Sequence, residues 1–370
     1  MSENHASAAT PLSAEPPVSV VIPTYNRKES LRRTLQGLSR QTLGDLAACE
    51  VLVVSDGSTD GTEEMLTEMA AAAGRDFPFL LRPVFQKNQG PSRARNRGIQ
   101  EARGEIVVFI DDDVEPVPEF LEKHLRHHRE DPAVAVVGPM SPDPANRANE
   151  AVWIGWEHAM LEKQYHNFRT GIWPGTGPNH FYSGNASVRR EHLLAVNGFD
   201  ESFTRQEDVE MAYRLERECG MTFRFDAEAV GLHRPIRSLE SWLKVPYAYG
   251  KLDVVRASRG DVSWDVIRYS YEGRNRLSRL VMDASLSIPG SGPWFRRALV
   301  AAASVLYRAR RDGTAFGLMS AVFNMRYIEG VGEEMRDPGA TRRVLRGTYP
   351  TATAEPALTK SPTPSGSTPP

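Results

Sequence analysis

Apolar and polar positions alternate along the first half of the chain in two different rhythms. Short apolar runs, each of a length typical of a buried strand, occupy residues 18–22, 51–54 and 106–110, and the mostly apolar segment 80–85 predicts a further strand. Between these runs, apolar residues recur every three or four positions, as in Leu31, Leu35 and Leu38, which predicts amphipathic helices. This alternation of strand and helix predicts an α/β domain, in which a mostly parallel sheet carries helices on both faces.

Two of the predicted helices carry additional signals. Asn26 is followed by Glu29, which is the pattern of an N-cap and a first-turn acid, so we expect Asn26 to cap the first helix. His124 and His128 stand four positions apart and share one helix face. We see no third ligand of matching geometry for them and interpret the pair as part of a polar helix surface.

The ends of the chain differ in composition from the middle. Residues 1–16 and 351–370 are rich in Pro, Ser, Thr and Ala, which predicts disordered tails. We expect the α/β domain to occupy residues 17–235 and a basic helical subdomain to occupy residues 236–350. The second segment carries 19 Lys and Arg against 11 Asp and Glu, although the whole chain has a net charge of −2.

The basic segment contains an amphipathic helical pattern. Its predicted apolar stripe consists of Leu299, Ala302, Val305, Leu306 and Ala309, with arginines beside it. A basic amphipathic helix can lie on an anionic membrane surface. The alternative is a subdomain that packs on the α/β domain or on another subunit. No apolar run approaches the about 20 residues of a membrane span, so membrane contact would be peripheral.

Composition restricts the broad class of protein. The chain is 40% hydrophobic and 25% charged, as in globular proteins, and we expect no nucleic-acid partner. Two cysteines, Cys49 and Cys219, offer neither a disulfide framework nor a metal-binding spacing, which favours a reducing compartment. The first residues are polar and prolines follow, unlike a signal peptide. We therefore expect a cytoplasmic protein, with any membrane contact at the inner face.

An acidic tripeptide ends the fourth predicted strand. Asp111, Asp112 and Asp113 directly follow the apolar run 106–110. Three adjacent carboxylates need a counter-charge, and hard divalent cations such as Mg²⁺ or Mn²⁺ commonly supply it. Ligands of open α/β sheets bind at the carboxyl ends of the strands. The alternative is an acidic surface turn, but the buried strand fixes where these acids lie and favours a metal-dependent site.

Two common nucleotide-binding motifs are missing from the sequence. A dinucleotide fold carries G-x-G-x-x-G after its first strand, but this chain has Pro23-Thr24-Tyr25-Asn26-Arg27 there. The phosphate-binding pattern G-x-x-x-x-G-K-S/T does not occur either. A nucleotide at this sheet would therefore be bound by a different set of residues.

Eight short segments occur in a characteristic order. They are Val18–Asn26, Val53–Asp60, Asn88–Gly90, Ala94–Asn96, Asp111–Asp113, Gly184–Ser187, Gly198–Asp200 and Glu207–Asp208. As an ordered set they resemble the family 2 glycosyltransferases of the GT-A fold over residues 18–235. The resemblance implies a GT-A-type α/β domain, followed here by a helical C-terminal extension.

The resemblance assigns the nucleotide to the ends of the first two strands. Asp56 matches the aspartate that accepts a hydrogen bond from the nucleobase, or it begins a tight turn and binds backbone amides. Pro23, Thr24 and Tyr25 would line the same pocket, where Tyr25 packs on the base or within the core. Arg95 falls at a position near the nucleotide, unless it belongs to a solvated helix face.

The resemblance also implies a metal site. Asp111 and Asp113 form a D-x-D pair, in which Asp113 binds Mg²⁺ or Mn²⁺ and Asp111 contacts the ribose or the metal. Asp112 lies between them and either contacts the nucleotide or metal or has a structural role. His233 is similar to a downstream histidine that completes the metal site, and its alternative is a purely structural role.

A second acidic pair is the candidate for the catalytic base. Glu207 and Asp208 begin a predicted helix whose apolar stripe includes Met211, Ala212 and Leu215. Asp208 aligns with this stripe, and the family places its base at this pair, so we predict Asp208 as the base. Glu207 is the alternative base or an acceptor ligand. As a plain alternative, acids are also favoured at a helix start.

The resemblance thus implies an inverting, metal-dependent transfer of a sugar from a nucleotide diphosphate sugar to a hydroxyl of a glycan or lipid-linked acceptor. Such chemistry belongs to the synthesis of polysaccharides and the cell envelope. A sugar nucleotidyltransferase is disfavoured, because its Gly-rich, Lys-containing motif is missing after the first strand. A non-catalytic nucleotide-sugar or glycan binder would need no second acidic pair.

Overall fold

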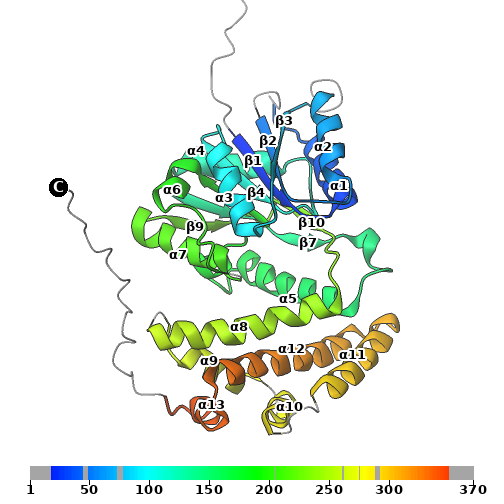
Figure 1. The fold of residues 1–370 in the computed structure, drawn as a ribbon, viewed down its shortest axis with the longest axis vertical. Coiled ribbons are helices and arrows are strands. Elements are labelled where there is room, and N and C mark those ends of the chain that lie inside the picture. The colour runs from blue at the N-terminus through cyan, green and yellow to red at the C-terminus, as the bar shows by residue number, and fades with distance from the viewer. Residues whose placement is uncertain are drawn as a thin grey trace, which may run out of the picture. The chain divides into compact units, whose positions relative to one another are not determined.

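The computed structural model describes residues 18–44, 49–72, 78–203, 205–260, 262–274, 276–287 and 292–349. The predicted tails, 1–16 and 351–370, lie outside the described residues. The chain divides into two compact units, Met1–Ser238 and Leu239–Pro370. Figure 1 shows the first unit from blue to green and the helical second unit from yellow-green to red.

A seven-stranded sheet forms the centre of the first unit (Figure 1). In spatial order its strands are β3 (Leu80–Gln86), β2 (Cys49–Asp56), β1 (Val18–Thr24), β4 (Ile106–Ile110), β8 (Asn185–Arg189), β6 (Val134–Val137) and β9 (Thr222–Phe225). Only β8 runs antiparallel to its two neighbours, and the other pairs are parallel. The predicted mostly parallel α/β sheet is confirmed.

Helices cover both faces of this sheet, as predicted. Neighbouring strand residues point to opposite faces, so Val20 packs in a core with Leu31, whereas Val21 packs with Ile99 on the other side. The first core includes α1 (Lys28–Leu38), α2 (Thr62–Ala71) and α4 (Phe120–Glu130), and the second includes α3 (Pro91–Glu101), α6 (Arg190–Ala195) and α7 (Glu207–Cys219).

A small second sheet brings distant segments to the end of β4. Its order is β5 (Val114–Pro116), β10 (Gly231–His233) and β7 (Met140–Pro142). Because β5 follows the acidic tripeptide directly and pairs His233 with Val114, the pairing places His233 beside Asp113. The other elements of this unit are η2 (Pro144–Asn146), α5 (Val152–Arg169) and η3 (Pro178–His180).

Two local predictions are wrong. Arg27, not Asn26, is the residue before α1; Asn26 has a positive φ of 52° and accepts a hydrogen bond from the Thr59 amide at 2.7 Å. His124 and His128 are also not on a polar surface, because both are buried and both contact the Ser187 hydroxyl, at 2.9 and 2.8 Å. In each case a contact with a distant segment outweighs the local pattern.

The second unit is helical. It comprises α8 (Leu239–Arg259), α9 (Asp265–Glu272), α10 (Arg276–Ser287), α11 (Gly292–Arg308), α12 (Asp312–Met335) and α13 (Pro338–Leu345). Gly250 of α8 faces the Tyr327 carbonyl so closely that a Cβ there would clash, which lets α8 and α12 approach each other. Leu299 packs against Val281 and Met325, so the predicted α11 stripe is partly internal. Across the described residues, every helix is too short or too polar to cross a bilayer.

Candidate active site

The carboxyl ends of β1, β2 and β4 meet at one edge of the sheet, because these neighbouring strands are parallel. A cavity of about 570 Å³ opens there. Of the residues predicted from the sequence, it is lined by Pro23, Thr24, Tyr25, Asp56, Arg95, Asp111, Asp112, Asp113, Glu207 and His233. Asp208 lies next to this lining, beside Glu207. The structure therefore gathers the predicted donor, metal and base residues in one place.

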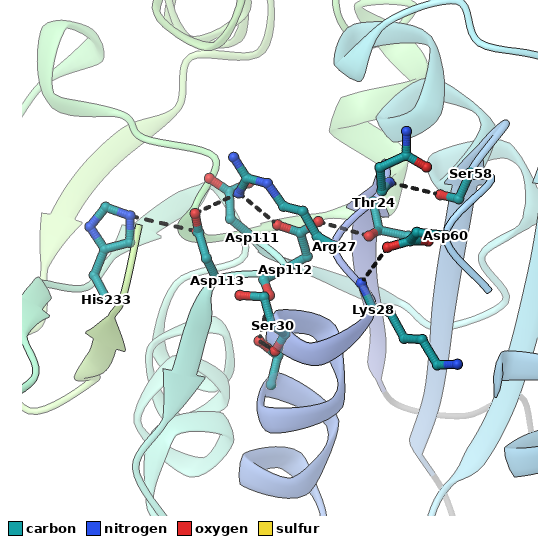
Figure 2. A network of polar contacts seen from close by, with 12 residues as sticks. Thr24, Arg27, Lys28, Ser30, Ser58, Asp60, Asp111, Asp112, Asp113 and His233 are labelled. Atoms are coloured by element: carbon teal, nitrogen blue, oxygen red, sulfur yellow. Dashed lines mark hydrogen bonds and ion pairs between the residues drawn. The ribbon is translucent and has the colours of Figure 1, made fainter. Parts of the chain in front are cut away.

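Arg27 is the main counter-charge of the acidic tripeptide (Figure 2). Its Nη1 lies 3.0 Å from Asp112 Oδ1 and 2.6 Å from Asp113 Oδ2. Asp112 also accepts a 2.7 Å hydrogen bond from the Thr24 hydroxyl, and Asp113 Oδ1 lies 3.6 Å from His233 Nε2. The acids are thus held in fixed positions by the start of α1 and the end of β10.

Asp112 and Asp113 differ in their electrostatics. Burial, opposed by Arg27 and assisted by the charge of Asp113, raises the pKa of Asp112 to about 7. Burial would also raise the pKa of Asp113, but the hydrogen bond and charge of His233, together with Arg27, hold it well below its usual range. Asp113 is therefore ionised at neutral pH, as a carboxylate ligand of a cation must be.

The donor atoms at this end of the cavity suit a hard divalent cation. Asp111, Asp113 and His233 supply carboxylate oxygens and an imidazole nitrogen. Ligand atoms lie about 2.1 Å from Mg²⁺, so two ligands of one ion are at most about 4.2 Å apart; the 3.6 Å between His233 and Asp113 meets that limit. Among the described residues no three acidic, His or Cys side chains form a ready-made metal site. To bind the ion, Asp113 would have to give up its ion pair with Arg27.

Arg95 connects the two acidic pairs. From α3, its Nη2 lies 2.7 Å from Asp111 Oδ1 and its Nη1 lies 3.4 Å from Glu207 Oε1. The side chain is 8% exposed, which excludes the solvated helix face that the sequence left open. Its Nε is buried without a hydrogen-bond partner among the described residues. One buried donor of Arg95 is therefore left without a partner.

Asp208 lies in a different environment from the tripeptide. Its Oδ1 accepts from the Val209 amide at 2.9 Å and its Oδ2 from the Ser183 amide at 3.3 Å, which orients the carboxyl group at the start of α7. Burial and the charge of Glu207 raise the pKa of Asp208 to about 6, although Arg95 counteracts them. A carboxyl group with such a pKa is suited to take up a proton near neutral pH.

Asp56 is extensively bonded within the protein. Its carboxylate accepts hydrogen bonds from Gln86 Nε2 and from the amides of Gln89 and Gly90, at 2.8–2.9 Å. These bonds fix the loop before α3, so Asp56 does bind backbone amides, as the alternative stated. Its contact with a nucleobase stays a prediction. Tyr25 is 49% exposed and lines the cavity, which excludes its alternative as a core tyrosine.

Two family-like motifs have structural explanations. Asn96 bonds both the carbonyl and the amide of Phe199, at 2.9 and 2.8 Å, and so ties α3 to the segment before α7. Gly184 leaves room for Asp111, because a Cβ there would lie 2.8 Å from Asp111 Oδ2. The sequence analysis missed three cationic residues of the cavity: Arg27, Arg205 and Arg237. No local pattern distinguishes these arginines from surface arginines.

The sequence is similar to those of known glycosyltransferases. The sequence model described as Glycosyl transferase family 2 matches residues 19–195. The glycosyltransferase AglE of Haloferax volcanii is 37% identical over 239 residues, which cover 65% of this chain and 73% of AglE. Validoxylamine A glucosyltransferase of Streptomyces hygroscopicus subsp. jinggangensis is 30% identical over 251 residues, covering 60% of this chain and 56% of that protein.

The chain spans only about half to two thirds of several of these relatives, such as 64% of YfnE from Bacillus subtilis and 46% of a pre-mycofactocin glycosyltransferase. Among solved structures, the mannosyltransferase PcManGT from Pyrobaculum calidifontis, in complex with GDP-Man and Mn²⁺, aligns with a TM-score of 0.52 at 20% identity. The alignment covers 87% of this chain and 88% of PcManGT. It shows that the two chains share a fold.

Proposed function

Because this chain belongs to glycosyl transferase family 2, we propose that it transfers a sugar from a nucleotide diphosphate sugar to a hydroxyl group of a glycan or a lipid-linked acceptor. The nucleotide would occupy the cavity at the ends of β1 and β2, near Tyr25 and Asp56. The reaction would invert the configuration at the anomeric carbon. The complex of PcManGT with GDP-Man supports a nucleotide sugar as the donor.

The observation that carries this proposal is the Arg95 bridge. One guanidinium contacts Asp111 of the tripeptide and Glu207 of the second acidic pair. The tripeptide suits cation and phosphate chemistry, whereas Asp208, beside Glu207, suits proton uptake. A binding protein needs only the first of these groups, but a transferase needs both within reach of one sugar.

In the proposed reaction, Asp208 takes the proton of the acceptor hydroxyl as the hydroxyl oxygen forms a bond to the anomeric carbon. The bond from that carbon to the diphosphate oxygen breaks on the opposite side, and its electron pair leaves with the nucleoside diphosphate. Attack and departure on opposite faces invert the configuration. Glu207, which lines the cavity, is the second candidate for the base.

A divalent cation bound by Asp111, Asp113 and His233 would neutralise charge on the leaving diphosphate. The chain's own guanidinium groups support the same task, because Arg27 and Arg95 line the cavity beside these acids. Planar guanidinium groups bind phosphate oxygens in a bidentate manner. The Mn²⁺ in the PcManGT complex supports the use of Mg²⁺ or Mn²⁺.

A donor panel tests the proposed function. The native protein is incubated with UDP-, GDP- and dTDP-sugars, with Mn²⁺, with Mg²⁺ or with EDTA, and free nucleoside diphosphate is measured without an acceptor. We expect slow, metal-dependent release from one nucleotide class. Asp208→Asn and Glu207→Gln are run beside it. Release from no donor in the panel would contradict the proposal.

We also propose that the second unit makes peripheral contact with the inner face of a membrane. On α11, Trp294 and Val305 are 74% and 65% exposed, and Ala298 and Ala301 between them are exposed too. Residues at these spacings share one side of a helix, which we name the α11 face. Arg297 borders it, with its guanidinium 5.5 Å from the centre of the Trp294 ring. An apolar face beside arginines is complementary to an anionic lipid surface.

Co-sedimentation with vesicles tests the α11 face. We expect the native protein to bind anionic vesicles at low salt, and to bind neutral vesicles or high-salt samples less. Arg297→Gln should weaken binding by about fivefold, since one basic group contributes about 1 kcal/mol; Trp294→Ser should weaken it as well. Arg217→Gln, on an exposed arginine of the first unit, is the control. Equal recovery in the supernatant under all conditions would favour a packing or dimer contact.

A further inference from the structure

A line of buried side chains leads from the cavity into the first unit. His233 Nδ1 lies 3.3 Å from His158 Nε2, and His158 Nδ1 lies 2.8 Å from Glu150 Oε1. On the other side of its ring, His233 turns Nε2 toward Asp113, as Figure 2 shows. The order Glu150, His158, His233, Asp113 therefore connects the interior to the acidic tripeptide through both nitrogens of both rings.

Separate elements supply the members of this line. Glu150 lies just before α5, His158 lies within α5, and His233 ends β10. The two imidazole rings cross at 76° with their centres 5.3 Å apart, so each ring presents an edge nitrogen to the other. The orientation of His233 is therefore set by α5 as well as by its own strand.

The burial of His158 and Glu150 indicates a role beyond packing. The side chains of His158 and Glu150 are only 4% and 5% exposed. A buried carboxylate costs free energy unless it is well paired. A negative charge near the start of α5 does favour that helix, but this effect requires neither a histidine at position 158 nor its contact with His233.

The chemistry of a histidine ligand supplies a reason. A ring nitrogen that binds a cation must be unprotonated, so the hydrogen of His233 must then be on Nδ1, where it needs an acceptor. His158 Nε2 can accept only if the hydrogen of His158 is on Nδ1. Glu150 is the acceptor that keeps it there, because an ionised carboxylate has no hydrogen to donate.

We propose that Glu150 and His158 are positioning residues for His233. They hold its ring with Nδ1 toward His158 and Nε2 turned toward Asp113, so that Nε2 can exchange its contact with Asp113 for a divalent cation. The cation-binding part of this inference rests on the proposed function, whereas the orientation of the ring does not.

Mn²⁺ binding tests the first part, measured for the metal alone through the electron paramagnetic resonance signal of the free ion. Glu150→Gln and His158→Phe should each raise the Kd for Mn²⁺ about tenfold. The double variant should bind Mn²⁺ no more weakly than His158→Phe does, because Glu150 acts on His233 through His158. His158→Gln, which keeps an acceptor oxygen, should recover part of the affinity. The control is Glu162→Gln on the same helix, whose carboxylate contacts Ser141 and Arg169. If the native protein binds Mn²⁺ and the variants bind it with the same Kd, the inference is wrong.

The ring orientation is tested without any metal. The Cε1–H signal of His233, assigned in NMR spectra with a His233→Gln variant, should shift in Glu150→Gln and keep its position in Glu162→Gln. Glu150→Gln preserves the shape of the buried side chain, so it guards against the failure of a harsher variant to fold. If the native protein binds no Mn²⁺, the metal-binding part of the proposed function is wrong. The NMR measurement then tests the orientation of the His233 ring by itself. If the Cε1–H signal of His233 keeps its position in Glu150→Gln, the inference is wrong.

Discussion

Asp113 and Asp208 are the same type of residue at two ends of one site, and their surroundings push them in opposite directions. Asp113 is held by Arg27 at 2.6 Å and faces His233, and these groups keep its pKa well below the usual range. Asp208 accepts hydrogen bonds from two backbone amides and lies beside Glu207. Its burial and the charge of Glu207 raise its pKa to about 6. Environment alone thus gives one carboxyl group a pKa far below neutral and the other a pKa close to it.

This difference suggests a division of labour within the site. A permanent anion can bind a cation or a positively charged partner at every physiological pH, but it is a poor base. A carboxyl group with a pKa of about 6 changes its protonation state close to neutral pH, which suits general base catalysis. Arg95, which contacts Asp111 and Glu207, lies between the two ends and keeps both acidic groups near one cavity.

The largest expected effect is on turnover. Asp208→Asn keeps the shape of the side chain but cannot accept a proton, so we expect kcat to fall by ~100-fold or more while donor binding persists. The measurement is release of nucleoside diphosphate at saturating donor. Glu207→Gln is the matched variant. If Glu207→Gln loses the rate and Asp208→Asn keeps it, the base is Glu207.

A smaller effect is expected at the other end of the site. Asp113→Asn removes a permanent charge, so Mn²⁺-supported nucleotide affinity should fall by about tenfold, equivalent to about 1.4 kcal/mol. Isothermal titration with the nucleoside diphosphate of the active donor measures this, and Glu68→Gln on the exposed side of α2 is the control. Unchanged affinity would mean that Asp113 does not bind the cation.

A third prediction concerns the stability of the fold and not the chemistry. Burial lowers the pKa of His124 to about 4 and that of His128 to about 3. The unfolded chain, with a histidine pKa of about 6.5, takes up protons that the folded chain does not. The free energy of unfolding is therefore highest above about pH 6.5 and falls as the pH drops toward 4 and then 3.

Near pH 5.5 this loss should amount to about 1.4 kcal/mol for each buried histidine. In His128→Leu, denaturant unfolding should show a smaller loss between pH 7.5 and pH 5.5 than in the native protein. An identical slope would show that His128 is not buried in its neutral form. The result also defines the pH range in which activity can be compared safely.

Much of the fold could be predicted because buried parallel strands read as unbroken apolar runs. The run at residues 106–110 matches β4, and the position of its acids followed from that strand. Arg27 could not be predicted, because its ion pairs join residues 85 and 86 positions apart, and no local pattern reveals them. His124 also reads as a surface residue locally, although it bonds Asn185 from a distant strand at 2.9 Å. Periodicity indicates which residues are buried only when they are apolar.

The pH dependence of turnover tests the central contrast most directly. The base must be unprotonated to act, so kcat at saturating donor should rise through an apparent pKa near 6 and be about tenfold lower at pH 5 than at its plateau. Circular dichroism at each pH confirms that the protein stays folded, and Asp208→Asn should lack this inflection. A kcat that stays flat from pH 8 to pH 5 in the folded native protein would contradict the assignment of Asp208 as the base with a raised pKa.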